Sequence, residues 1–156
     1  MINKHVHGLG DIVWLLLHNK ALVAAIMASV VAQVLKLFTY YIQEHRINFR
    51  HLVTTGGMPS SHTAMVCALA TSIGMLHGWK SSEFAIAFVF SSIVMYDAAG
   101  VRRAAGKQAK ILNQIMDDVV NRGRITGGKL TELIGHTPLE VFAGAILGVL
   151  IAFIMF

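Results

Sequence analysis

The chain has 156 residues, of which 55% are hydrophobic and 13% charged, and its formal net charge is +5 at pH 7. Soluble domains carry roughly 25% charged residues, so this composition excludes an ordinary water-soluble domain and indicates one membrane-embedded domain over residues 1–156. The single cysteine, Cys67, excludes a disulfide framework within the chain.

Four segments are long and apolar enough to form transmembrane helices, which need about 20 residues at a rise of about 1.5 Å each. They cover residues 21–44, 61–77, 82–99 and 138–156. A shorter apolar run over residues 9–19 predicts an N-terminal helix that lies at the membrane interface. Because lipid offers no partners to unpaired backbone groups, we expect an all-α, polytopic membrane helix bundle.

The long polar segment over residues 100–135 sets the expected orientation. It holds seven Lys and Arg residues against three acidic ones, and positive charge marks the cytoplasmic side of a membrane protein. Its apolar positions recur at three- and four-residue steps, which predicts a cytoplasmic amphipathic helix that ends at Arg122-Gly123. We therefore expect a bacterial inner-membrane protein whose second span starts, third span ends and fourth span starts at the cytoplasmic face.

One side of the first span carries polar side chains in an apolar sequence. Gln33, Lys36, Tyr40 and Glu44 follow one another at three- and four-residue steps, which places them on one face of a helix. Lys36 either extends its ammonium group to the membrane interface or faces inward, where it would bind phosphate oxygens. We favour the inward position because Gln33 lies beside it.

The second span begins with the sequence Gly56-Gly57-Met58-Pro59-Ser60-Ser61-His62. Glycine lets a backbone approach a ligand closely, and the free N–H groups of a helix start bind anions such as phosphate. These properties favour phosphate contacts from Ser60 and Ser61, supported by Gly57, and a proton-donating role for His62. The alternative is an ordinary capped helix with an interfacial histidine.

The third span ends with Asp97-Ala98-Ala99-Gly100-Val101-Arg102-Arg103. The planar guanidinium group of an arginine suits bidentate phosphate binding, which makes Arg102 and Arg103 candidate phosphate ligands. Arginines at such a position also fix topology or contact anionic headgroups. Asp97 is an acid in an apolar span, and we expect it to pair with an arginine or a histidine of the site, or to hold a metal.

The fourth span begins with Gly135-His136-Thr137-Pro138-Leu139-Glu140. His136 and Glu140 are four residues apart and share one face of a helix. A carboxylate on one imidazole nitrogen fixes the tautomer and leaves the other nitrogen as a nucleophile or base. An acid at the start of an apolar run is costly in lipid and usually functional, so we favour a site over a chance surface pair.

These motifs supply two histidines, one orienting carboxylate and several fixed cations to one end of the bundle. Phosphoryl transfer through a phosphohistidine requires this set: a nucleophile, an acid for the leaving alcohol, and positive charge for the phosphate oxygens. Because the cations belong to the protein, neither a metal nor a cofactor is required.

Two of the motifs are also similar to those of a known superfamily. Pro59-Ser60-Ser61-His62 resembles the Pro-Ser-Gly-His motif of type 2 phosphatidic acid phosphatases (PAP2), which are related to acid phosphatases and vanadium-dependent haloperoxidases. Residues 136–144, His-Thr-Pro-Leu-Glu-Val-Phe-Ala-Gly, resemble the last motif of that superfamily, His-Tyr-Pro-x-Asp-Val-x-Ala-Gly. Together with Asp-x-x-Gly-Val-Arg-Arg, they make the chain similar to the divergent branch found in bacteria and plants.

The resemblance implies a role for each matching residue. His136 would be the nucleophile, Glu140 would replace the orienting Asp of the superfamily, and His62 would be the general acid. Lys36 and the amides of residues 60–61 would bind the phosphate group.

The chain departs from the superfamily at two arginine positions. Lys36 lacks the Arg-Pro that follows the lysine of the first motif, and Leu130 stands where an arginine precedes the nucleophilic histidine. We infer that Arg102 or Arg103 takes over the missing contact.

A cytoplasmic site favours a phospholipid-synthesis intermediate, of the phosphatidylglycerophosphate or phosphatidate type, over an undecaprenyl (pyro)phosphate released outside. A non-enzymatic lipid-phosphate binding or transport protein stays an alternative, whereas a haem protein using His62 and His136 is disfavoured because both histidines lie at one membrane edge. The expected partners are the lipid phosphate and membrane lipids, with no nucleic acid. Gly144 and Gly148, at small-xxx-small spacing, suggest a face for a homodimer.

Overall fold

The computed structural model describes residues 8–44, 57–121 and 135–156. These residues are mainly helical, with no strand among them, so the predicted all-α class is confirmed. The elements are α1 (Leu9–Leu17), α2 (Lys20–Glu44), α3 (Ser61–His77), α4 (Ser82–Tyr96), the π-helix η2 (Asp97–Val101), α5 (Arg102–Asn121) and α6 (Pro138–Met155).

Three helical stretches of the described chain are long and apolar enough to cross a membrane, namely Lys20–Ile42, Ser82–Asp117 and Pro138–Met155. The second of them runs from α4 through η2 into α5 without interruption. The remaining predicted span forms α3, which has 17 residues and so lies at the lower end of the length of a membrane helix, about 17–25 residues. All four predicted segments are helices, and a count of four membrane crossings stays a prediction.

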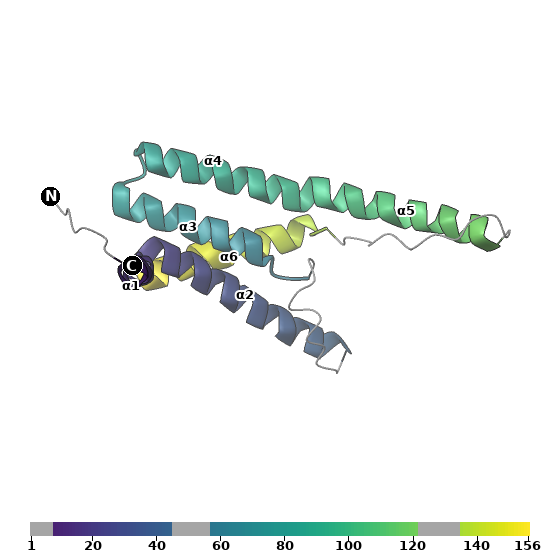
Figure 1. Ribbon diagram of the computed structural model, residues 1–156, viewed down its shortest axis with the longest axis horizontal. Coiled ribbons are helices and arrows are strands. Elements are labelled where there is room, and N and C mark those ends of the chain that lie inside the picture. The colour runs from purple at the N-terminus through teal and green to yellow at the C-terminus, as the bar shows by residue number, and fades with distance from the viewer. Residues whose placement is uncertain (1–7, 45–56, 122–134) are drawn as a thin grey trace.

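Helix α3 lies at the centre of the bundle. It packs against α2, α4 and α6, and α2 also packs against α6 (Figure 1). The core between α2, α3 and α6 consists mostly of alanines, with two larger side chains of α6 at its edge: Ala28, Ala32, Ala64, Ala68, Leu147 and Ile151. Such small side chains let helix backbones approach closely, as is common in membrane bundles.

Gly144 and Gly148 bring α6 into direct contact with α3. A Cβ atom at Gly144 would lie 2.5 Å from the carbonyl oxygen of Ser60, and one at Gly148 would overlap the carbonyl oxygen of Ala64. The prediction that these glycines offer a face to a second copy of the chain is therefore wrong, because α3 of the same chain already covers them. Homodimerisation itself stays a prediction.

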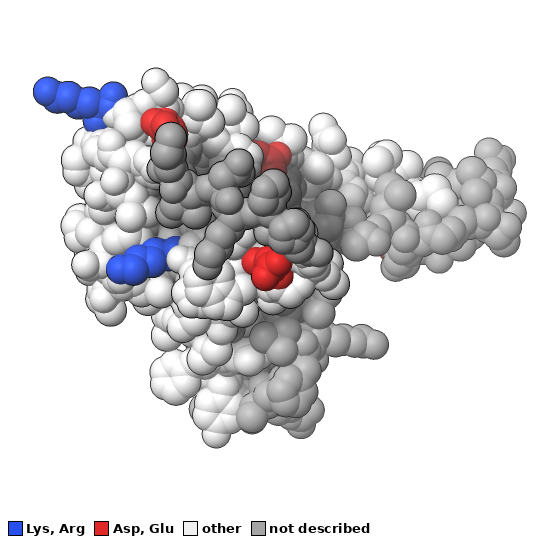
Figure 2. All heavy atoms as spheres, turned by 60° about the vertical axis from the view of Figure 1, so that its left-hand side comes forward, with Lys and Arg blue, Asp and Glu red and all other residues white. Residues whose placement is uncertain are grey.

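The outward faces of α2 and α6 carry large apolar side chains at three- and four-residue steps. These exposed residues are Ile26, Val30, Val34 and Phe38 on α2, and Phe142, Ile146, Leu150 and Phe153 on α6. Figure 2 shows a face made mostly of uncharged residues, with only scattered Lys, Arg, Asp and Glu side chains. Extended apolar faces of this kind suit contact with lipid tails.

The amphipathic helix predicted within residues 100–135 is found as α5, which extends beyond the rest of the bundle (Figure 1). Ile111, Leu112 and Ile115 are exposed on it, as are Lys107 and Lys110. Its predicted end at Arg122-Gly123 lies outside the described residues. The short N-terminal helix is found as α1, and the interfacial position of α1 and the cytoplasmic position of α5 stay predictions.

Candidate active site

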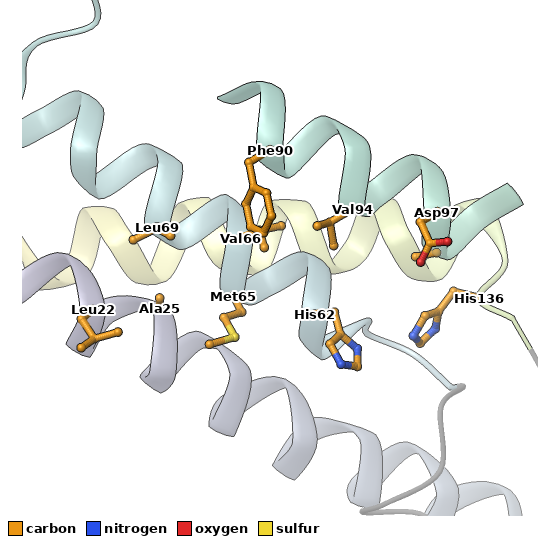
Figure 3. Close-up of a pocket in the computed structure, with 11 residues that line it drawn as sticks. Leu22, Ala25, His62, Met65, Val66, Leu69, Phe90, Val94, Asp97 and His136 are labelled. Atoms are coloured by element: carbon orange, nitrogen blue, oxygen red, sulfur yellow. The ribbon is translucent and has the colours of Figure 1, made fainter. Parts of the chain in front are cut away.

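The start of α3, the end of α4 and the start of α6 contribute to one cavity. His62, Asp97 and His136, one from each of these places, line a cavity of about 350 Å³. Figure 3 shows the three side chains together at one end of this cavity. The structure thus brings both predicted histidines to a common space, with the acid of the third span beside them.

The start of α6 holds His136 and Glu140 in a fixed relationship. Thr137 and Glu140 form a capping box, in which Glu140 N–H donates to Thr137 Oγ1 at 3.3 Å and Thr137 N–H donates to Glu140 Oε2 at 3.1 Å. The same Oε2 lies 3.0 Å from Nδ1 of His136. A neutral His136 protonated on Nδ1 donates to this oxygen and keeps the lone pair of Nε2 free for chemistry.

Thr137 was not among the predicted site residues, although the sequence carried the signal. A Thr followed three residues later by Glu, just before an apolar run, is the signature of a capping box. The box matters here because the oxygen that caps the helix also orients the imidazole ring. His136 itself is only 3% exposed.

Lys36 faces into the bundle, as favoured from the sequence. Lys36 as a whole is only 2% exposed, so its ammonium group does not extend along the outer surface of the bundle. It lies close enough to Glu140 for the two charges to attract each other. Gln33, one turn earlier on α2, is half-buried. Helix α2 therefore adds a buried lysine to the end of the bundle that holds His136 and Glu140, although Lys36 is not among the residues that line the cavity.

Ser60 makes contacts within the protein in place of the predicted phosphate contact of its amide. It is fully buried, and its Oγ accepts hydrogen bonds from Thr63 N–H at 3.4 Å and from Thr63 Oγ1 at 3.0 Å. Its own N–H donates to the carbonyl oxygen of Glu140 at 3.0 Å. Phosphate binding by the Ser60 amide is therefore a wrong prediction, because that amide already ties α3 to α6.

Ser61 stays a candidate phosphate ligand. It is the first residue of α3 and is buried, and within the described parts of the chain no acceptor bonds its N–H group. The N–H groups of a first helical turn point outward from the helix end and favour anions. The second of the two predicted amide donors is thus still available.

Gly57 supports the start of α3 by a close contact with α2. Its φ is +85°, a conformation that side-chain-bearing residues rarely adopt, and a Cβ atom there would lie 2.8 Å from the Tyr40 hydroxyl oxygen. Thr39 Oγ1 adds hydrogen bonds to the carbonyl oxygens of Lys36 at 2.8 Å and Met58 at 3.1 Å. These contacts hold the segment before His62 against the helix that carries Lys36.

Asp97 begins the π-helix η2 between α4 and α5 and is half-buried at the cavity. Single π-helical turns within α-helices occur frequently at functional sites. The described residues contain no group of three or more His, Cys, Asp or Glu side chains placed to hold a metal ion. The side chains of Arg102 and Arg103 lie outside the described part, so phosphate binding by either arginine stays a prediction.

The remaining wall of the cavity is apolar, and its residues were not predicted. They are Leu22, Ala25, Met65, Val66, Leu69, Phe90, Val94 and Ala98. Helix periodicity could have found the residues on α3 and α4, because steps of three, four and seven residues from a site residue return to the same face. Met65, Val66 and Leu69 follow His62 at those steps.

The comparison with known proteins agrees with the motifs at the two helix starts. Residues 17–151 match a family described as the divergent PAP2 family. The chain belongs to this family. The uncharacterized membrane protein YuiD of Bacillus subtilis (strain 168) is 39% identical over 151 residues, which cover 90% of this chain and 96% of the relative. No solved structure matches the sequence.

This divergent PAP2 chain is a membrane protein, as its relative and its apolar helices indicate. Its Pro-Ser-Ser-His motif, residues 59–62, forms the capped start of α3, and its last motif, residues 136–144, forms the capped start of α6. The hydrogen bond from Ser60 N–H to the Glu140 carbonyl oxygen joins the two starts directly. The arrangement provides an oriented imidazole, a second imidazole and a buried cation, which are the groups that phosphoryl transfer to a nitrogen nucleophile needs.

Proposed function

We propose that this protein is a membrane phosphatase that hydrolyses a lipid phosphomonoester, of the phosphatidylglycerophosphate or phosphatidate type, through a phosphohistidine intermediate. The observation that carries the proposal is the 3.0 Å contact between Glu140 Oε2 and His136 Nδ1 at the edge of a cavity shared with His62. A carboxylate on Nδ1 directs the lone pair of Nε2 and stabilises the positive charge that the ring gains when it attacks.

In the first step, Nε2 of His136 attacks phosphorus, and the bond from phosphorus to the glycerol oxygen breaks. A protonated His62 gives its proton to that leaving oxygen. In the second step, neutral His62 takes a proton from a water molecule whose oxygen attacks phosphorus, and the nitrogen–phosphorus bond breaks. Inorganic phosphate leaves, His62 is protonated again, and His136 returns to the neutral form that donates from Nδ1 to Glu140.

The cations and the helix start stabilise charge during both steps. The ammonium group of Lys36, the N–H of Ser61 and a guanidinium of Arg102 or Arg103 would contact the phosphate oxygens. Fixed donors in a site that excludes bulk water act more strongly than the same groups in water. Asp97 lines the same cavity as the two imidazoles, so its carboxylate lies near the place where the leaving alcohol would be protonated.

The cellular position of the site follows from charge. The seven Lys and Arg residues of the segment over residues 100–135 support a position of the start of α3 and the start of α6 at the cytoplasmic face of a bacterial inner membrane. That face gives access to intermediates of phospholipid synthesis, which supports these substrates over undecaprenyl (pyro)phosphate.

Phosphate release from a panel of lipid phosphates, with and without a chelator, tests the proposal. We expect the purified protein to release phosphate from phosphatidylglycerophosphate or phosphatidate, with no effect of the chelator. His136→Ala should abolish release, whereas His77→Ala, at the opposite and exposed end of α3, should not. A folded wild-type protein that binds these lipids without releasing phosphate would support the non-enzymatic alternative.

A further inference from the structure

The cavity extends well beyond the three polar side chains at its end. Its apolar part, which we call the tail channel, is formed by Leu22 and Ala25 of α2, Met65 and Leu69 of α3, and Phe90 and Val94 of α4. Figure 3 shows these side chains spread along the helices away from His62 and His136. A phosphate group needs only the polar end, so the channel has no part in the proposed chemistry.

The length of the channel follows from the helices that form it. From His62 to Leu69, and equally from Asp97 back to Phe90, seven helical residues span about 10 Å, which is about a third of the hydrocarbon thickness of a bilayer. The whole cavity, at about 350 Å³, lies near the lower limit of ligand pockets, about 300–1,000 Å³. A space of this length and volume suits a single hydrocarbon chain.

The channel also has a lateral opening. Helices α2 and α4 both pack on α3 but hardly contact each other, so they leave a gap in front of α3. Met65 and Phe90, which line the channel, are both partly exposed, so the channel is not closed off from its surroundings. A chain can therefore move from the surrounding lipid into the channel without crossing a polar barrier.

We propose that one hydrocarbon chain of the lipid phosphate enters between α2 and α4 and lies in the tail channel, with its phosphate group between His62 and His136. This inference rests on the proposed function for the identity of the headgroup. Because bilayer and channel are equally apolar, the transfer of the chain contributes little affinity. Its effect is to orient the lipid, so that the phosphorus atom lies in front of Nε2 of His136.

Photocrosslinking tests the channel without depending on turnover. The probe is phosphatidate with a diazirine in the headgroup-proximal half of one acyl chain, added to the protein in vesicles. We expect crosslinks on the channel faces of α3 and α4, around Leu69 and Val94. Val94→Trp should lower this labelling at least 10-fold, and Val34→Trp, at an exposed position on the outer face of α2, should leave it unchanged. Leu69→Phe fills the channel from α3 and provides a second variant if Val94→Trp does not fold.

Two outcomes separate this inference from the proposed function. If the wild type is labelled in the channel but releases no phosphate, and Val94→Trp removes the labelling, the channel is retained and the phosphatase is rejected. Two results would overturn the channel and retain the phosphatase. One is a protein that releases phosphate but is labelled only on its outer faces. The other is that Val94→Trp and Leu69→Phe are as active as the wild type on long-chain phosphatidate.

Discussion

Glu140 Oε2 accepts from Thr137 N–H at 3.1 Å and lies 3.0 Å from His136 Nδ1, so one oxygen both caps α6 and orients an imidazole ring. The cap fixes the carboxylate relative to the helix axis, and the carboxylate fixes the ring. The orientation of His136 is therefore determined by the backbone of α6 rather than by a flexible loop. Rigid support of this kind is what a positioned nucleophile requires.

Glu140→Gln should separate the two tasks of this side chain. Glutamine still completes a capping box, so the cap itself is kept, and we expect any loss of stability to come from the buried ammonium group of Lys36, which loses its counter-charge. Glutamine lacks the charge that stabilises a positive imidazole ring, so kcat should fall by about 10²–10⁴-fold. Thermal unfolding and phosphate release measure the two effects.

Thr137→Ala provides the matched control for this variant. It removes the cap on Glu140 N–H, which stabilises a helix by about 0.5–2 kcal/mol, and leaves the carboxylate beside His136. We expect lower stability with most of the activity retained. Equal activity of Glu140→Gln and the wild type would contradict the orienting role of Glu140.

Lys36→Met should remove activity without lowering stability. Methionine has a similar length and requires no desolvation of a charge, and Glu140 keeps its bonds to His136 and Thr137. We expect the melting temperature to stay the same or rise and phosphate release to fall by about 10²-fold or more. Lys80→Met, in the exposed turn before α4, should change neither. A parallel loss of stability and activity would show that Lys36 is structural.

Gly144→Ala should disturb the contact that joins the two helix starts. The new Cβ atom would lie 2.5 Å from the Ser60 carbonyl oxygen, and forcing a methyl group into a packed interface costs about 1–3 kcal/mol. Gly10→Ala is the control, because a Cβ atom on Gly10 meets nothing within 4 Å. Thermal unfolding should show a lower melting temperature for Gly144→Ala and no change for Gly10→Ala. An unchanged melting temperature of Gly144→Ala would mean that α6 can shift away from α3.

Cysteine accessibility tests which face of the membrane holds the site. The native Cys67 is buried and should not react. We expect Lys80→Cys to react with an impermeant maleimide in intact cells and Lys107→Cys, on α5, to react only after permeabilisation. The opposite pattern would place the site outside and favour undecaprenyl carrier substrates.

Helix positions were predictable from the sequence, whereas the pairing of helix faces was not. Runs of apolar residues between Gly, Pro and Ser predicted α2, α3 and α6 to within about two residues, because a spanning helix must satisfy its own backbone. The glycines at 144 and 148 have the same spacing whether they contact another chain or α3. Only the fold shows that α3 covers them.

The candidate site was predictable where local spacing decides it. The contact between His136 and Glu140 follows from a four-residue step, and the inward position of Lys36 follows from its neighbour Gln33. The structural position of Ser60 depends on the Glu140 carbonyl oxygen, about 80 residues further along the chain. Likewise, the tail channel requires three helices to be placed together, so its outline is not present in any single segment.

Rapid-quench labelling with lipid substrate carrying ³²P in its phosphomonoester group tests the central claim most directly. We predict an acid-labile, alkali-stable label on His136 that is absent from His136→Asn, present in the His77→Asn control, and prolonged in His62→Ala, which lacks the base for the second step. Phosphate release by the wild type with no label on His136 in either the wild type or His62→Ala would contradict the account.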